Sequence, residues 1–147
     1  MRKVSIFIAG CLLLALGMGI YGQGRDLDAI MKEIGPLWTG PGGLGARGGR
    51  GGGDAAAAPD TAKIAADAAK LQALFKEAEG QFTKLKMAEP AGMASKISDA
   101  AGNLAKEAKT GKIADLQASK TAIGQCKACH DKYRESDGAG GFKLKQQ

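Results

Sequence analysis

Apolar residues recur at helical spacing in four stretches of the chain. In the first, residues 25–38, the apolar residues that share one face of a helix are Leu27, Ile30, Met31 and Ile34. Gly35 and Pro36 come next, and this pair is expected to kink or end the helix, because proline lacks the N–H that a helix interior requires. Residues 23–38 are therefore predicted to form the first helix of the fold.

Three further helices are predicted after Pro59. The second begins at Asp60 or Thr61 as its cap, and its apolar positions alternate between spacings of four and three residues. A turn around Pro90 is expected to lead into a helix over 93–109, and a last helix is predicted over 113–135. The positions expected to face inward are Ile64, Ala68, Leu71, Phe75, Ala78 and Phe82 in the second helix, Ile97, Ala101, Leu104 and Ala108 in the third, and Leu116, Ile123 and Tyr133 in the fourth.

The chain offers no pattern for a β-sheet. Its single valine is Val4, and no stretch alternates apolar and polar residues as a half-buried strand does. The spacing of the second helix is typical of helices that interdigitate side by side in a bundle. We therefore predict an all-α fold, an antiparallel four-helix bundle with a glycine-rich loop between its first and second helices.

The composition of residues 39–60, "TGPGGLGARGGRGGGDAAAAPD", predicts a flexible Gly/Ala-rich loop. Glycine costs too much backbone entropy for a regular element to persist there. The part "ARGGRGGG" is similar to tracts in RNA-binding proteins, but it has two arginines and no aromatic residue, which favours a linker. Residues 61–136 then hold helices two to four, and residues 137–147 are predicted to be a frayed tail.

The first 22 residues have the layout of a secretory signal peptide. Arg2 and Lys3 precede an uncharged apolar run over 4–20, and small residues follow before the polar "QGRDLD". Cleavage is the favoured interpretation, and an uncleaved membrane anchor is the alternative. The "IAGC" ending at Cys11 also resembles a lipoprotein box, but too little apolar sequence precedes this cysteine.

The net charge bears on the partners that the protein could bind. Removal of residues 1–22 would lower the charge from +6 to +4, because it takes away Arg2 and Lys3 but no acid. A small positive charge suits docking to an acidic partner protein. Nucleic-acid binding would need a clustered basic and aromatic surface, so no nucleic-acid partner is expected.

Most of the ligand chemistry lies in one late stretch, "GQCKACHDKYRE", residues 124–135. Cys126, Cys129 and His130 stand at i, i+3 and i+4, so on a helix their side chains share a face. This is the C-x-x-C-H attachment motif of c-type haem, in which two thiols form thioethers with the vinyl groups and the histidine binds the iron. We expect one covalently attached haem c.

Other uses of the motif are less well supported by the chain. A structural zinc site needs four protein ligands, and after removal of the signal no second ligand pair is present. A thioredoxin-like redox motif would require a βαβ setting. A structural disulfide between Cys126 and Cys129 suits an oxidising compartment but leaves His130 unexplained.

With "CKACHDKYR" in the last helix of a predicted bundle, the chain resembles the class II c-type cytochromes, cytochrome c′ and cytochrome c556. The family pattern C-x-x-C-H-x-x-[YF]-R is matched at each position from Cys126 to Arg134. The resemblance covers residues 25–136. It implies that Cys126 and Cys129 anchor the haem, that His130 is the proximal iron ligand, and that Tyr133 and Arg134 are haem neighbours.

The sixth iron position decides between two functions. The chain has no second histidine, so the candidates are a methionine or a vacant site. The resemblance implies that the distal residue comes from the first helix, which makes Met31 the favoured metal ligand. The alignment departs from the family at Leu27, where an arginine is often found, and Arg25 is therefore not expected to take that arginine's role.

We therefore expect a monohaem electron carrier in the periplasm, with Met31 and His130 as iron ligands, that docks with redox partner proteins and is not an enzyme. The alternative is a five-coordinate, cytochrome c′-like protein that binds NO or CO as small gaseous ligands. A peroxidase is disfavoured because no distal histidine and arginine pair is visible. Family members often dimerise through their first two helices, so a homodimer is a further expectation, although the glycine-rich loop falls between those helices here.

Overall fold

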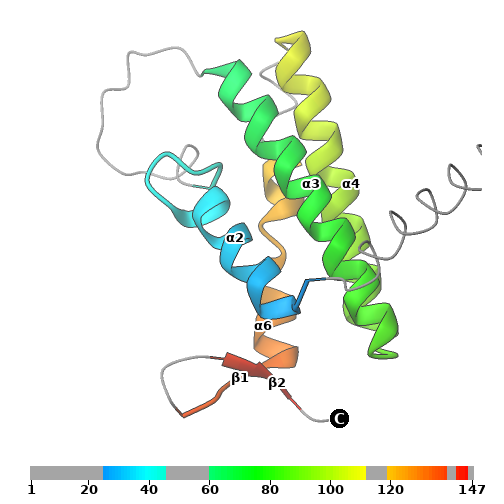
Figure 1. Ribbon diagram of the computed structural model, residues 1–147. Helices are drawn as coiled ribbons and strands as arrows, with labels where there is room; N and C mark the ends of the chain where they lie inside the picture. Colours follow the sequence, from blue (N-terminus) through cyan, green and yellow to red (C-terminus); the bar gives the residue numbers. More distant parts are fainter. Residues whose placement is uncertain (1–24, 46–59, 112–118, 139–141, 146–147) are drawn as a thin grey trace, which may run out of the picture.

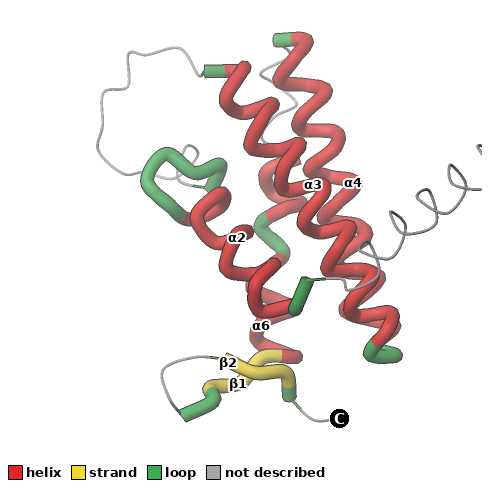
Figure 2. The backbone as a smooth tube through the Cα atoms, viewed as in Figure 1, coloured by secondary structure: helices red, strands yellow, loops and turns green. Residues whose placement is uncertain are grey.

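The structure is a computed structural model that describes residues 25–45, 60–111, 119–138 and 142–145 (Figure 1). These residues are mostly helical, which confirms the predicted all-α class (Figure 2). The predicted signal or anchor over 1–22 and residues 46–59 of the glycine-rich loop lie outside the described residues. Within the described ranges, no helix combines the length and hydrophobicity needed to cross a membrane.

Helices α3, Thr61–Lys84, and α4, Ala88–Thr110, form a helical hairpin and pack along their lengths (Figure 1). The Asp60 carboxylate caps α3 by accepting a hydrogen bond from the Lys63 N–H at 2.9 Å. Helix α4 begins five residues earlier than predicted. Pro90 lies in its first turn, where a missing N–H leaves no helical hydrogen bond unmade, so Pro90 follows the turn rather than forming it.

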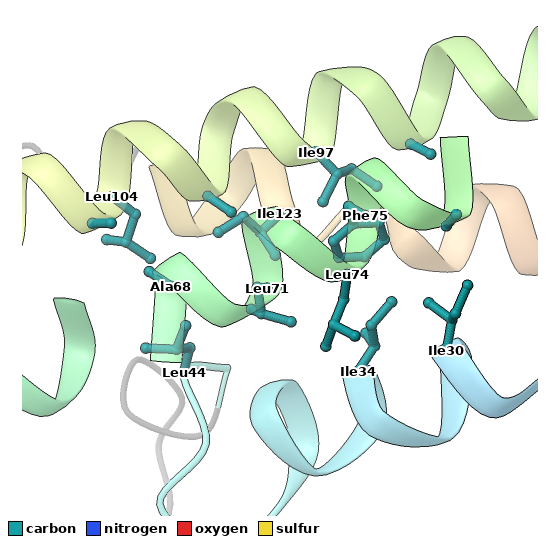
Figure 3. Packing of buried hydrophobic residues seen from close by; sticks show 14 of the residues in the cluster. Ile30, Ile34, Leu44, Ala68, Leu71, Leu74, Phe75, Ile97, Leu104 and Ile123 are labelled. Atoms are coloured by element: carbon teal, nitrogen blue, oxygen red, sulfur yellow. The ribbon is translucent and has the colours of Figure 1, made fainter. Parts of the chain in front are cut away.

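The predicted inward faces of α3 and α4 are confirmed. Every position expected to face inward in these helices is buried, and Ala68, Leu71, Ala101 and Leu104 have no exposed surface at all. Small residues predominate on the buried face of α4, so the larger side chains of α3 can pack closely against it. Their packing is the main body of the hydrophobic core (Figure 3).

Helix α2, Leu27–Thr39, covers one side of this hairpin. Its residues Ile30 and Ile34 are buried and point toward Leu74 and Phe75 of α3 (Figure 3). The helix was expected to kink or end at Gly35 and Pro36, but it continues to Thr39. Proline removes one hydrogen bond from the helix, because it has no N–H. The helix nevertheless continues for one more turn, which is closed by the Gly40 N–H donating to the Pro36 carbonyl at 3.1 Å.

The start of the predicted flexible loop is ordered. After α2 the chain turns back, and the N–H groups of Leu44 and Gly45 donate to the carbonyls of Leu37 and Trp38 at 2.9 Å. This turn puts Leu44 into the core with no exposed surface (Figure 3). Thr39 still belongs to α2, and residues 40–45 are loop as predicted but form a defined turn, because burial of a leucine outweighs the entropy cost of ordering the glycines.

The fourth predicted helix is interrupted. Residues 119–123 are helical, a turn follows at Gly124 and Gln125, and helix α6 runs over Cys126–Tyr133. The predicted helix thus ends two residues early, and its first residues, including Leu116, lie outside the described residues. Ile123 is fully buried and Tyr133 is 2 % exposed, which confirms both predicted contacts.

A two-stranded sheet follows α6, although no strand was predicted. Strands β1, Arg134–Ser136, and β2, Phe142–Leu144, pair antiparallel with Glu135 opposite Lys143 (Figure 1). The tail over 137–147 was predicted to fray, and this is wrong for β2. Leu144 of β2 packs against the core, which holds the sheet in place.

Candidate functional site

The C-x-x-C-H residues lie together on α6. Cys126 is the first residue of the helix, and Cys129 and His130 follow one turn later, so the three side chains share a helical face. All three are partly buried, and neither cysteine is in a disulfide. The structure therefore brings together two free thiols and one imidazole, each with some access to solvent.

Helix α6 has only eight residues, too few to be stable alone, so tertiary contacts hold it. Ile123, just before the helix, is buried in the core between elements of the hairpin (Figure 3). The Cys126 side chain packs against the same core, and its Sγ–H donates to the Ile123 carbonyl at 3.1 Å. Tyr133, the last residue of the helix, is also buried.

An ion pair joins the end of α6 to the start of α4. The Lys132 ammonium donates to both oxygens of the Glu89 carboxylate at 2.7 Å. Glu89 lies in the first turn of α4, where the positive end of the helix dipole favours a carboxylate. Nothing in the sequence marks Glu89, one surface glutamate among several, as the partner of a lysine 43 residues away.

The residue after β2 also holds α6. The Lys145 N–H donates to the Tyr133 carbonyl at 2.9 Å, and its ammonium donates to the Asp131 carbonyl at 2.7 Å. These bonds satisfy carbonyls at the C-terminus of the helix that have no partner within it. The short helix is thus fixed at both sides, by Glu89 and by Lys145.

Burial sets the protonation of the ligating groups. It raises the pKa of the Cys126 thiol to about 11, and it also raises the pKa of Cys129, to which the charge of Glu89 adds. Burial lowers the pKa of His130, and the positive charge of Arg134 lowers it further. At neutral pH the cysteines are therefore thiols and the histidine is a neutral imidazole, the form that binds a metal.

Arg134 lies at the start of β1, directly after α6. Its guanidinium carbon lies 3.7 Å from the centroid of the Phe142 ring. The resemblance implies a place beside the proximal face of the haem, and Arg134 does follow His130 by four residues. Its observed contact in the described part of the chain is with the C-terminal hairpin.

Met31 approaches the core from α2. Its side chain is partly buried and packs against the same hydrophobic cluster as Cys126. The two residues are thus attached to one core from different helices. Arg25, before α2, bonds Glu77 through two nitrogens at 2.9 and 2.7 Å and also pairs with Glu33, so its guanidinium is engaged in fixing α2 to α3.

The donor set fits a covalently attached haem. Thioether formation needs two free thiols on one face, axial ligation needs a neutral imidazole beside them, and α6 supplies these groups. Within the described ranges, no group of three or more His, Cys, Asp or Glu residues is arranged to hold a bare metal ion.

No known protein family, no curated protein and no solved structure matches this chain.

Proposed function

We propose that this protein is a monohaem c-type cytochrome that carries electrons outside the cytoplasm. The observation that carries the proposal is the arrangement of Cys126, Cys129 and His130 on one face of α6 as free thiols and a neutral imidazole. Cys126 and Cys129 would hold the haem covalently, and His130 would bind its iron. When bound, the haem supplies one-electron oxidation and reduction.

The chain's own residues have defined tasks in this function. Glu89 and Lys145 hold the haem-bearing helix at its C-terminal half, and Ile123 fixes its start in the core. A rigid attachment suits electron transfer, because little reorganisation then accompanies a change of one charge. No side chain is required to make or break a substrate bond, so we propose no enzymatic activity.

Met31 is proposed as the sixth ligand. It is a partly buried thioether on α2 that shares a hydrophobic cluster with Cys126. A methionine opposite a histidine raises the reduction potential of the iron and leaves no open position. If Met31 only packs, the iron would be five-coordinate, and the protein would bind NO or CO in place of its role as a carrier.

The proposal extends to the assembly and location of the protein. We propose that the helices complete an antiparallel four-helix bundle, since α2, α3, α4 and the helical segment before α6 all contribute to one core. Thioether attachment of haem takes place outside the cytoplasm, and the basic and apolar start of the chain suits export, so we propose a periplasmic protein.

The decisive test is an absorption spectrum of the purified protein, oxidised and reduced, with and without CO. A low-spin spectrum with a sulfur-to-ferric band, unchanged by CO, would support the electron carrier. A high-spin spectrum that shifts with CO would support the gas-binding alternative. A protein expressed with a haem-attachment system that carries no covalent haem would refute both.

A cysteine variant tests the attachment itself. Cys129→Ala should leave haem held by one thioether or lose it, which changes the spectrum of the reduced pyridine complex. The matched control is Ala128→Ser, an exposed neighbour on α6 that should keep both thioethers. An unchanged two-thioether spectrum in Cys129→Ala would contradict the assignment.

A further inference from the structure

The C-terminal hairpin presents an exposed arginine on an aromatic ring. Arg134 of β1 lies over Phe142 of β2 at 3.7 Å, and Phe142 is 56 % exposed. The strand register pairs Arg134 with Leu144 and Ser136 with Phe142, so Arg134 and Phe142 are diagonal neighbours on one face of the sheet. The contact is therefore built into the register and is not a chance meeting of two loop residues.

Arg134 keeps its charge available. The neighbouring lysines on α6 and β2 are neutralised by carboxylates: Lys127 by Asp131 at 2.6 Å, Lys132 by Glu89 at 2.7 Å and Lys143 by Glu135 at 3.4 Å. Arg134 pairs with no carboxylate in the part of the chain that the structure describes. Its guanidinium lies over the face of the Phe142 ring, a cation–π contact that leaves the charge of the arginine in place.

The pair is held in a fixed place beside the proposed haem site. Leu144, on the same face of the hairpin, packs against the core, and the Lys145 N–H bonds the last carbonyl of α6 at 2.9 Å. Phe142 lies two residues before Leu144 and is exposed to solvent. Arg134 follows the proposed iron ligand His130 by four residues, so a protein bound here would be close to the haem-bearing helix.

We propose that Arg134 and Phe142 form a docking surface for an acidic protein partner. A carboxylate of the partner would accept two hydrogen bonds from the guanidinium edge, and an apolar side chain would cover the exposed ring. Arginine and aromatic residues are enriched at the centres of protein interfaces, and the net positive charge, +6 for the full chain or +4 without residues 1–22, attracts acidic proteins. That this partner exchanges electrons rests on the proposed function; the docking surface itself does not.

The test uses an acidic [2Fe–2S] ferredoxin as the probe, with binding measured by calorimetry at low and at physiological salt. Arg134→Gln and Phe142→Ser should each weaken binding by about fivefold or more, the effect expected of an interface residue that contributes to affinity. The control is Lys127→Gln, which makes the same change in net charge at a paired lysine and should weaken binding less than about twofold. Circular dichroism should be unchanged in all three, because the residues are exposed.

Three outcomes would overturn the proposal. Equal weakening by Arg134→Gln and Lys127→Gln would mean that net charge alone attracts the probe. Full affinity in Phe142→Ser would mean that the ring is not covered. Self-association of the protein that Phe142→Ser abolishes would mean that a second copy of this chain occupies the surface.

The two proposals fail separately. The binding measurements are made on the haem-free protein and on the protein expressed with a haem-attachment system. A protein that binds the probe through Arg134 and Phe142 but takes up no haem would refute the proposed function and support the docking surface. A haem-bearing protein whose affinity for the probe is unchanged by Arg134→Gln and by Phe142→Ser would support the proposed function and refute the docking surface.

Discussion

Lys132 and Glu89 form an ion pair in which the ammonium nitrogen lies 2.7 Å from each carboxylate oxygen. The two residues are 43 positions apart in sequence, and their contact joins the helix that carries the cysteines to the first turn of α4. Both side chains are more than half exposed, so water weakens the attraction. The pair therefore orients α6 more than it stabilises the fold as a whole.

Glu89→Gln should loosen α6 while leaving global stability almost unchanged. Amide hydrogen exchange of residues 126–133 should become faster, and the urea midpoint should move only slightly. Asp67→Asn is the matched control, because Asp67 pairs with Lys63 inside α3 and should not alter exchange in α6. Equal exchange in α6 for both variants would show that Glu89 does not orient the helix.

The same pair should depend on pH at both ends of the scale. Lys132 lowers the pKa of Glu89 in the folded protein. The ion pair is therefore fully formed above the carboxyl pKa of the unfolded chain, about 4.3, and is lost as the pH falls through the lower pKa of the folded protein. Glu89 in turn raises the pKa of Lys132, so the ion pair is lost at high pH only beyond the ordinary lysine pKa of about 10.4. The protection of α6 amides against exchange, relative to their intrinsic exchange rate at each pH, should thus be highest between these limits.

The cysteines of the haem-free protein should react slowly with iodoacetamide. Burial raises the pKa of Cys126 to about 11, so at pH 8 only about one thiol in a thousand is ionised. Alkylation of Cys126 should be at least about tenfold slower in the folded protein than in urea. Mass spectrometry after limited reaction measures this, and Cys129, which does not pack against the core cluster, should be modified first. Rapid modification of Cys126 would contradict the described burial.

Ile123→Ala should destabilise the protein by about 2–5 kcal/mol, because Ile123 is fully buried and its truncation leaves a cavity under the start of α6. Urea denaturation followed by circular dichroism measures the change. Leu85→Ala, at a leucine that is 54 % exposed, should cost no more than about 0.5 kcal/mol. Similar losses in the two variants would place Ile123 outside the core.

Gly43→Ala should destabilise the turn that buries Leu44, by about 1–3 kcal/mol. A Cβ at residue 43 would lie 2.8 Å from the Trp38 carbonyl oxygen and 2.9 Å from that of Gly40, and backbone atoms cannot move aside cheaply. Gly92→Ala in α4 meets no atom within 4 Å and should instead stabilise the protein by up to about 1 kcal/mol. Thermal unfolding of the two variants should therefore shift in opposite directions.

Met31→Ala should convert the haem-bearing protein from low spin to high spin and make its reduced form reactive with CO. Loss of the sulfur-to-ferric band would accompany the change. Met87→Ala is the control, since Met87 also packs against the core but lies at the α3–α4 turn. A spectrum that follows Met87 and not Met31 would move the sixth ligand to the turn.

Several features could be predicted because they depend on neighbours along the chain. The helical class, the Asp60 cap and the buried seams of α3 and α4 follow from spacing and side-chain type, and the structure confirms each. The sharing of one face by Cys126, Cys129 and His130 follows from the geometry of a single helix. Such features need no knowledge of the rest of the fold.

Other features were decided by contacts between distant segments. Leu44 is ordered within a glycine-rich stretch because the core has room for it, and α2 passes Pro36 because its later residues still pack. The tail forms a strand because Leu144 reaches the core and the register brings Phe142 to Arg134. The pairing of Glu89 with Lys132 is of the same kind. Sequence by itself determined which residues carry the proposed chemistry, and the tertiary structure decided what holds and surrounds them, because burial and long-range pairing have no local pattern.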